Sequence, residues 1–167
     1  MNDLLTQSDI DKMSEELEYR KAELRHELLD QVKEAKAQGD LSENFEYKAA
    51  KREKNRNESR IRYLERMIKT AKIIDDDTAD DEVGINSKVT IYIPEDDEEE
   101  TYKIVTTVRG DVTSGRVSNV SPIGKALMKH KVGDKVSIRV NDNYSYEAII
   151  RSIEQVGEEE SDELMRF

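Results

Sequence analysis

Two acidic residues, Asp40 and Glu43, stand three positions apart in the segment that reads GDLSEN from position 39. Carboxylate oxygens are the ligands that Mg²⁺ prefers, so this pair could take part in metal-dependent chemistry. Two carboxylates are too few for a complete Mg²⁺ site, and any catalytic role would have to be completed by another molecule. The same spacing is typical of a capping box, in which acids satisfy free N–H groups at a helix start. Spacing alone favours capping.

The residues on both sides of the acidic pair have the periodicity of long helices. Apolar residues recur at steps of three, four and seven, which places them on one face of each helix. The first stripe contains Ile10, Met13, Leu17, Leu24, Leu28, Val32 and Ala35, and the second contains Phe45, Ala49, Ile61, Leu64, Ile68 and Ala71. Thr6 or Ser8 can cap the start of the first helix, and Gly39 suits its end. Each helix is roughly 30 residues and so about 45 Å long.

The link between the two helices, residues 39–42, is short, which makes the helices antiparallel neighbours. We therefore predict a long helical hairpin over residues 1–75, with an acidic tip at 39–46. Asn57 falls on the apolar line of the second helix. A polar residue at such a position commonly fixes the register of two helices at some cost in stability.

Charge is distributed unevenly along the chain. The whole sequence carries −11, with 38 acidic and 27 basic residues. Residues 1–43 carry −6 and residues 44–74 carry +6, while residues 75–167 hold the entire net charge. A basic stripe on the second helix consists of Lys48, Lys51, Arg52, Arg56 and Arg60. Such a stripe can follow the phosphates of RNA. The alternative is a solvated face that pairs with the acidic first helix.

The second half of the chain has the pattern of a small α+β domain. Residues 76–87 are an acidic linker, and from residue 88 apolar residues alternate with polar ones, as in strands. Strands are expected at 89–93, 101–108, 116–120, 135–140 and 144–153, and the acidic residues 94–100 mark a turn. A short helix follows Ser121 as N-cap, with Pro122 at its first position. The domain is predicted over 88–156 and an acidic, mobile tail over 157–167.

Composition excludes several classes of protein. The chain has no cysteine and only two histidines, which excludes a disulfide-stapled module and makes a Cys- or His-based metal site improbable. It has no apolar run long enough to span a membrane, and its polar N-terminus does not resemble a signal peptide. We expect a cytoplasmic protein with no membrane partner. Global acidity argues against binding to free DNA.

The tip segment, together with the following Glu46-Tyr47-Lys48-Ala49-Ala50-Lys51, resembles the tip signature of the bacterial Gre transcript-cleavage factors. The resemblance continues through residues 60–75 and resumes at 117–127 and at Gly133-Asp134. It covers roughly residues 8–155 and is nearer to the GreA branch than to the GreB branch.

The resemblance implies an N-terminal antiparallel coiled coil and a C-terminal domain with an FKBP-like fold. It implies that the globular domain docks on RNA polymerase, while the hairpin enters the secondary channel. Asp40 and Glu43 would then help to hold the second Mg²⁺ of the polymerase active site, which is shared with the polymerase. Cleavage of the backtracked RNA 3′ end would follow, and elongation would resume. The chain would stimulate the nuclease activity of the polymerase and would not itself be an enzyme.

Other residues receive expected roles from the same resemblance and from their positions. Ser42 and Asn44 would shape the tip, and Tyr47 would lie near the transcript. The basic stripe could contact extruded RNA, and the chain is expected to act as a monomer. Docking on the polymerase is assigned to Ser121, Pro122 and Ile123. Their alternative role is an ordinary helix start, with Ile123 facing the core.

Two further functions remain open on the sequence. The first is a channel-binding regulator that inhibits the polymerase or competes for it without promoting cleavage. The second is a coiled-coil adaptor with a prolyl-isomerase-like domain, which the low aromatic content of 5% disfavours because a deep aromatic pocket is improbable. Measuring RNA cleavage with variants of Asp40 and Glu43 would separate the alternatives.

Overall fold

A computed structural model of the chain describes residues 3–39, 44–75 and 78–166. The chain forms two compact units. The first consists chiefly of residues 7–72, and the second of residues 4–6 and 73–166. No helix within the described ranges is long and apolar enough to cross a membrane.

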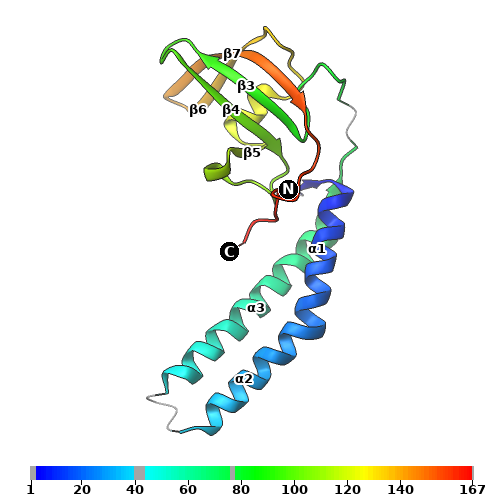
Figure 1. Ribbon diagram of the computed structural model, residues 1–167, viewed down its shortest axis with the longest axis vertical. Coiled ribbons are helices and arrows are strands. Elements are labelled where there is room, and N and C mark those ends of the chain that lie inside the picture. Colours follow the sequence, from blue (N-terminus) through cyan, green and yellow to red (C-terminus); the bar gives the residue numbers. More distant parts are fainter. Residues whose placement is uncertain (1–2, 40–43, 76–77, 167) are drawn as a thin grey trace. The chain divides into compact units, whose positions relative to one another are not determined.

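The first unit is a helical hairpin, as the periodicity predicts (Figure 1). Its first arm consists of α1 (Gln7–Tyr19), a π-helical turn η1 (Arg20–Leu24) and α2 (Arg25–Ala37). Its second arm is the single helix α3 (Phe45–Thr70). At 1.5 Å per residue, the 26 residues of α3 span about 39 Å.

The seam between the arms is narrow and is apolar at most positions. Its buried apolar side chains are Met13, Leu28 and Ala35 on the first arm and Ile61, Leu64 and Met67 on the second. Near the tip the predicted stripe is wrong, because Phe45 is 79% exposed and Ala49 is also exposed. Ala50 and Lys54, which are partly buried, occupy the corresponding positions. The π-helical turn was not predicted.

A two-stranded sheet joins the segment before α1 to the segment after α3. Strand β1 (Leu4–Leu5) pairs with β2 (Lys72–Ile73). The N–H of Lys72 donates to Asp3 O, and the N–H of Ile74 donates to Leu5 O, both at 2.9 Å. Strands of two residues have no detectable alternation, so the sequence did not reveal this pair.

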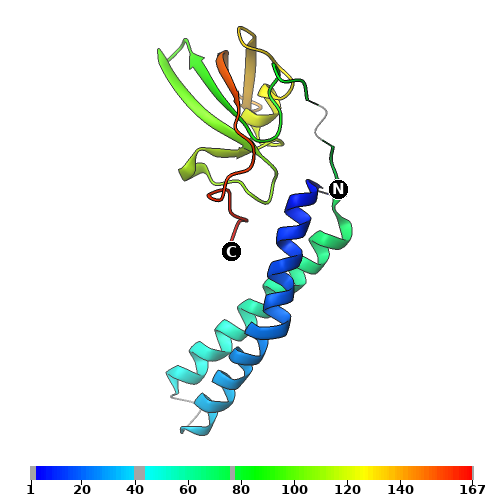
Figure 2. The same ribbon diagram turned by 45° about the vertical axis from the view of Figure 1, so that its right-hand side comes forward.

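The second unit is built on a five-stranded sheet in the order β5-β4-β3-β7-β6. Its strands are β3 (Ser87–Ile93), β4 (Glu98–Val105), β5 (Arg116–Ser118), β6 (Lys135–Asn141) and β7 (Tyr144–Gln155). Neighbouring strands are antiparallel except for β4 and β5, which are parallel. The sheet is strongly twisted (Figure 2). The predicted two-domain architecture of a helical hairpin and an α+β domain is confirmed.

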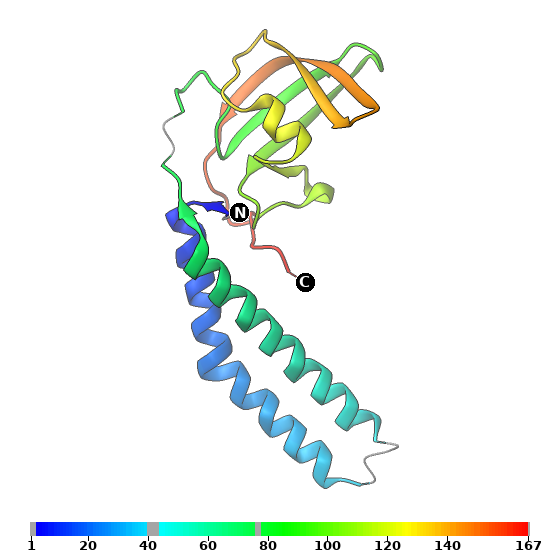
Figure 3. The same ribbon diagram turned by 180° about the vertical axis from the view of Figure 1, so that it is seen from behind.

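Helix α4 (Pro122–Leu127) lies against one face of the sheet (Figure 3). Its fully buried Leu127 joins a core formed by alternate residues of the strands, including Val89, Ile91, Ile138 and Ile150. A 3₁₀ turn, η2 (Val112–Ser114), precedes β5. Strand β4 begins at Glu98, earlier than predicted, because residues 98–100 pair with β3 instead of remaining in the turn.

The segment predicted as an acidic linker, residues 76–87, contributes to this core at its end. Val83 is completely buried and Ile85 is 8% exposed. The N–H of Val83 donates to His130 O at 2.9 Å, and the N–H of Lys129 donates to Val83 O at 2.8 Å. The acidic composition of this segment predicts a linker, but these two apolar residues belong to the folded unit.

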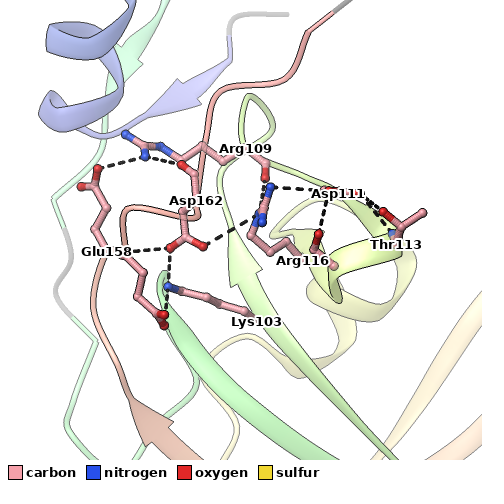
Figure 4. A network of polar contacts seen from close by, with 9 residues as sticks. Lys103, Arg109, Asp111, Thr113, Arg116, Glu158 and Asp162 are labelled. Atoms are coloured by element: carbon pink, nitrogen blue, oxygen red, sulfur yellow. Dashed lines mark hydrogen bonds and ion pairs between the residues drawn. The ribbon is translucent and has the colours of Figure 1, made fainter.

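The C-terminal segment also differs from the mobile tail that its composition predicts. Asp162 is 3% exposed, and its carboxylate pairs with Lys103 on β4 (Figure 4). The N–H of Glu159 donates to Asp162 Oδ2 at 3.0 Å, and Met165 N–H donates to Val108 O at 2.7 Å. The segment is therefore held against the domain by backbone and ionic contacts.

Two arginines complete this network. Arg109 Nη1 donates to the backbone O of Asp162 at 2.7 Å and lies 2.9 Å from Glu158 Oε1. Arg116 Nε lies 3.9 Å from Asp162 Oδ1 (Figure 4). Cations at 103, 109 and 116 are thus neutralised by acids from the end of the chain. This pairing explains why an acidic segment folds back instead of remaining solvated.

Candidate functional site

The hairpin tip joins the end of α2 at Ala37 to the start of α3 at Phe45. The predicted site residues Asp40, Ser42 and Glu43 lie outside the described residues. The residues on either side of them are described, and they define how the two helix ends are held. Among the described residues, no group of three or more acidic or histidine side chains could hold a metal ion.

Asn44 connects the two helix ends. Its side-chain Oδ1 accepts a hydrogen bond from the N–H of Tyr47 at 2.9 Å, which makes Asn44 the N-cap of α3. Its Nδ2 donates to Ala35 O at 2.7 Å, and Ala35 lies in the last turn of α2. One amide side chain therefore satisfies a free N–H at the start of one helix and adds a second donor to the Ala35 carbonyl at the end of the other, which also accepts from Gln38 N–H. This arrangement holds the two ends of the link together.

The position of this cap bears on the capping interpretation of Asp40 and Glu43. A capping box over these residues makes Asp40 the N-cap. In the structure the N-cap of α3 is Asn44, whose side chain satisfies the N–H that a capping residue normally satisfies. α3 therefore does not depend on Asp40 as its N-cap.

The first turn of α3 carries an aromatic residue and a cation on its exposed side. Lys48 Nζ lies 5.7 Å from the centre of the Phe45 ring, within the range of a cation–π contact. Tyr47 is partly buried, and its N–H is held by Asn44. A large exposed apolar ring at the end of a hairpin has no partner in the core, and it is available to another molecule.

The predicted basic stripe is divided by the structure. Lys48, Lys51, Arg52 and Arg56 are all exposed on α3. Arg60 is only 6% exposed, and it forms a two-point ion pair with Glu16, with Nε–Oε2 at 2.7 Å and Nη2–Oε1 at 3.1 Å. Arg60 therefore lies in the seam of the hairpin and does not belong to the exposed basic face.

Pairing between the arms does not follow the simple division into an acidic and a basic helix. Arg60 of the second arm pairs with an acid of the first, as the charge map predicts. In other pairs the basic residue is on the first arm and the acid on the second: Arg25 binds Glu58, and Lys21 binds Glu65. The basic residues nearest the tip are thus not neutralised by these contacts.

Electrostatics in the seam centre on Glu16. Burial of its carboxyl raises the pKa, but hydrogen bonds from Arg60 and Arg20 outweigh burial and bring the pKa below its ordinary value. Arg20 Nε donates to Glu16 Oε2 at 2.8 Å and Arg20 Nη1 to Asn57 Oδ1, also at 2.8 Å. The apolar spacing of α3 marks Asn57, but no local pattern in the sequence marks Arg20 as its partner.

The three residues assigned to docking form the start of α4. Ser121 Oγ accepts from Gly124 N–H at 3.1 Å and donates to Ser118 O at 2.6 Å, which confirms its predicted role as N-cap. Ile123 is partly buried and packs against the core. Pro122 is exposed, and the neighbouring Val120 is 58% exposed. The outer surface of this segment therefore consists mainly of residues 120 and 122.

Comparison with known families covers both units. The N-terminal transcription elongation factor domain of the GreA/GreB family matches residues 3–73, and the C-terminal GreA/GreB domain matches residues 78–155. The chain belongs to the GreA/GreB family of transcription elongation factors. The Gre resemblance found at the tip is thereby confirmed over most of the chain.

Relatives of the GreA type are similar to the chain over most of their length. Transcription elongation factor GreA of Thermoanaerobacter pseudethanolicus is 46% identical over 138 residues, which cover 82% of this chain and 88% of the relative. GreA of Mesomycoplasma hyopneumoniae is 39% identical over 155 residues, or 93% of this chain and 94% of the relative. The chain is thus a GreA-like Gre factor.

Solved structures that are similar to the chain include GreA factor homolog 1 (Gfh1) of Thermus thermophilus. It is 28% identical with a TM-score of 0.43, over 92% of this chain and 99% of that chain. A GreA/GreB elongation factor from Nitrosomonas europaea is 21% identical with a TM-score of 0.39, over 56% of this chain and 77% of that chain.

Proposed function

We propose that this Gre factor binds RNA polymerase, inserts its hairpin into the secondary channel and stimulates cleavage of backtracked RNA by the polymerase itself. In this role Asp40 and Glu43 supply oxygen ligands, and the chain has no nuclease activity of its own. The observation that carries the proposal is the pair of bonds made by Asn44. They hold the ends of both helices beside the short link that contains the two acids.

The donor set of the tip suits a shared Mg²⁺ better than a resident one. Carboxylate oxygens fit Mg²⁺, which usually binds one or two protein carboxylates and keeps several waters. A second Mg²⁺ held jointly with the polymerase would stabilise the charge that develops during phosphodiester hydrolysis. Asp40 and Glu43 are thus proposed as ligands that complete a site in the partner.

The exposed basic residues next to the tip would act on the RNA. Lys48, Lys51 and Arg52 lie on the first two turns of α3 and are exposed. Each phosphate contact adds attraction that decreases as the salt concentration rises. With Tyr47 near the transcript, these side chains would hold the extruded 3′ segment beside the carboxylates. Arg56 extends the same face, whereas Arg60 is occupied by Glu16.

Docking on the polymerase is proposed for the segment around the start of α4. Within the predicted set of Ser121, Pro122 and Ile123, the first is engaged in capping and the third packs on the core. We therefore assign the direct contact to the exposed Pro122, together with Val120. A Pro122→Asp variant is expected to weaken polymerase binding about tenfold without changing the unfolding midpoint of the free protein.

The experiment that tests this function is single-turnover cleavage of RNA in a backtracked elongation complex with Mg²⁺. Asp40→Asn and Glu43→Gln preserve shape and remove charge, and each is expected to reduce the cleavage rate at saturating factor at least tenfold. Glu46→Gln is the matched control, because Glu46 is an exposed acid in the first turn of α3. Polymerase affinity is measured separately by competition with labelled wild-type factor.

The outcomes distinguish the competing functions. Unchanged cleavage by the two tip variants would show that the carboxylates have no chemical role. If the wild-type factor binds polymerase and slows elongation but does not promote cleavage, the chain is an inhibitor. A capping role alone predicts a loss of activity only in proportion to lost folded protein.

A further inference from the structure

A polar network crosses the hairpin about halfway between its ends. Asn57 and Arg60 on α3 are 3% and 6% exposed, although they occupy a seam that is lined mostly by apolar side chains. They meet Glu16 and Arg20 of the first arm. We call these four residues the seam network. Arg20 contacts both Glu16 and Asn57, and Glu16 also binds Arg60, so the four side chains form a continuous chain of contacts between the helices.

The seam network lies at the π-helical turn η1, and α3 binds both ends of that turn. At the first end, Asn57 Nδ2 donates to the backbone O of Arg20 at 3.4 Å, and Arg20 Nη1 donates to Asn57 Oδ1 at 2.8 Å. At the other end, Arg25 forms two bonds to Glu58, at 2.8 and 3.0 Å. The Arg25 N–H also donates to Arg20 O, which closes the wide turn. Asn57 and Glu58 of α3 therefore bind Arg20, the first residue of η1, and Arg25, the residue that follows it.

These contacts specify one alignment of the two arms. An apolar seam of Leu, Ile, Met and Ala can pack in more than one register, because such side chains interchange with little loss. A slip of one helical turn moves one arm by about 5.4 Å along the other. Asn57 and the buried guanidinium of Arg60 would then lose their partners inside the seam, which carries the full desolvation penalty of each group. The alternative registers are therefore strongly disfavoured.

The alignment of the two arms at Asn57 also determines how the ends of α2 and α3 meet beside the tip. Helix α2 has 13 residues, so the tip end lies about 20 Å from η1 along a continuous helix. Its last turn is attached to the start of α3 through Asn44. A shift between the arms would pull these ends apart or move the short link between them. Metal-assisted chemistry is sensitive to displacements of about 1 Å, so the register matters for the tip acids.

We propose that the seam network and η1 form a positioning element for the hairpin tip: they fix the register of α2 against α3, and with it the placement of Asp40 and Glu43. The second half of this statement rests on the proposed function. Asn57 and Arg20 are positioning residues, since they lie far along the helices from the reacting atoms. The predicted consequence is that removal of the network relaxes the register and lowers cleavage without weakening the docking of the factor.

The test uses the full-length chain with Asn57→Leu, which places an apolar residue in an apolar seam. The second variant is the quadruple substitution Glu16→Leu/Arg20→Leu/Asn57→Leu/Arg60→Leu, which replaces the whole seam network, because the two-point contact between Arg60 and Glu16 would otherwise still oppose a slip. Asn55→Leu is the matched control: the same substitution, two residues away, at an exposed position of α3. The chain contains no cysteine, so spin labels can be placed at Lys33→Cys on α2 and Glu53→Cys on α3, two exposed positions outside the residues proposed to contact RNA.

Two readouts are measured: the distance distribution between the labels by pulsed electron resonance, and single-turnover RNA cleavage at saturating factor. For the quadruple variant we expect a distribution that broadens or divides and a cleavage rate at least tenfold lower, and for Asn57→Leu we expect smaller changes in the same direction. Polymerase affinity should change less than twofold, and the unfolding midpoint of the quadruple variant should not fall, because apolar residues that replace a whole buried ionic network are often neutral or stabilising. A merely structural role would instead lower stability and activity together.

The outcomes separate this proposal from the proposed function. A single narrow distance distribution in both variants, identical to that of Asn55→Leu, would overturn the register assignment whatever the cleavage rates are. A broadened distribution with unchanged cleavage would overturn the positioning role. If the wild-type factor or the Asp40 and Glu43 variants contradict the cleavage function, positioning for cleavage fails with it. The distance measurement still decides the register in that case.

Discussion

Replacing Asn44 tests how the tip is held together. Asn44→Ala removes two hydrogen bonds at once: the N-cap bond to Tyr47 N–H and the bond from Nδ2 to Ala35 O. Loss of an N-cap costs about 0.5–2 kcal/mol. Loss of a further ordinary hydrogen bond costs about 0.5–1.5 kcal/mol. We therefore expect Asn44→Ala to lower the free energy of unfolding by about 1–3.5 kcal/mol.

A second substitution separates the two bonds. Asn44→Asp keeps an oxygen that can accept from Tyr47 N–H, and its charge is favourable at a helix N-terminus. It has no donor for Ala35 O and places a carboxylate beside that carbonyl at the C-terminal end of α2, where negative charge is unfavourable. Asn44→Asp should therefore retain the protection of the Tyr47 amide and lose the connection to α2.

The assay combines urea denaturation with amide hydrogen exchange at the first turn of α3. Asn55→Ala is the control, since Asn55 is exposed on the same helix and alanine is the better helix former. Its stability should be unchanged or slightly higher. If Asn44→Ala unfolds at the same urea concentration as the wild type and exchanges Tyr47 N–H no faster, the two bonds do not hold the tip, and the argument for a fixed tip is wrong.

Three further predictions concern the rest of the molecule. Gly124→Ala should destabilise the sheet domain by about 3 kcal/mol, because an added Cβ would lie 2.0 Å from Ser118 O; an unchanged thermal midpoint would contradict this contact. Asp162→Ala should cost about 2–3 kcal/mol, less than the roughly 3–5 of a fully enclosed pair, because detachment of the C-terminal segment lets water reach Lys103. Asp142→Ala, at an exposed position, is the control, and equal free energies of unfolding in urea for the two variants would refute the buried pairing. The lowered pKa of Glu16 stabilises the hairpin at pH values above its ordinary pKa of 4.5, and this contribution should be lost as the pH falls below 4.5 towards the folded pKa. Glu16→Gln should flatten that part of the stability–pH curve, and an unaltered curve would show that Glu16 is not the group responsible.

The elements that could be predicted from the sequence are those with a repeated local pattern. Apolar spacing of three and four residues predicts both arms of the hairpin, and alternation predicts the strands around Val89 and Ile150. The cap at Ser121 was predictable because the N-cap, the following proline and the short apolar turn are adjacent. At the tip, the same apolar spacing was misleading, since Phe45 continues the stripe beyond the point where the helices bury their seam.

The features that were missed depend on contacts between distant positions. The hydrogen-bonded pair of Lys103 and Asp162 joins residues 59 positions apart, and no local pattern marks the acidic C-terminal segment as folded. The turn η1 is stabilised by Asn57 and Glu58, which lie more than 30 residues away from it. Helical spacing places Arg60 on the RNA-facing stripe, because spacing gives only the direction in which a side chain leaves the helix and not the partner that it meets. Its partner Glu16 decides that it lies in the seam.

The central claim is that Asp40 and Glu43 complete a Mg²⁺ site in the polymerase. It is tested most directly by the Mg²⁺ dependence of RNA cleavage in a backtracked complex saturated with factor. With wild-type factor, half-maximal cleavage should require much less Mg²⁺ than without factor. Glu43→Gln and Asp40→Asn should each raise the required Mg²⁺ concentration at least about tenfold, whereas Glu46→Gln should leave it unchanged. A uniform fall in rate with the same Mg²⁺ dependence would contradict the claim that these carboxylates bind the metal.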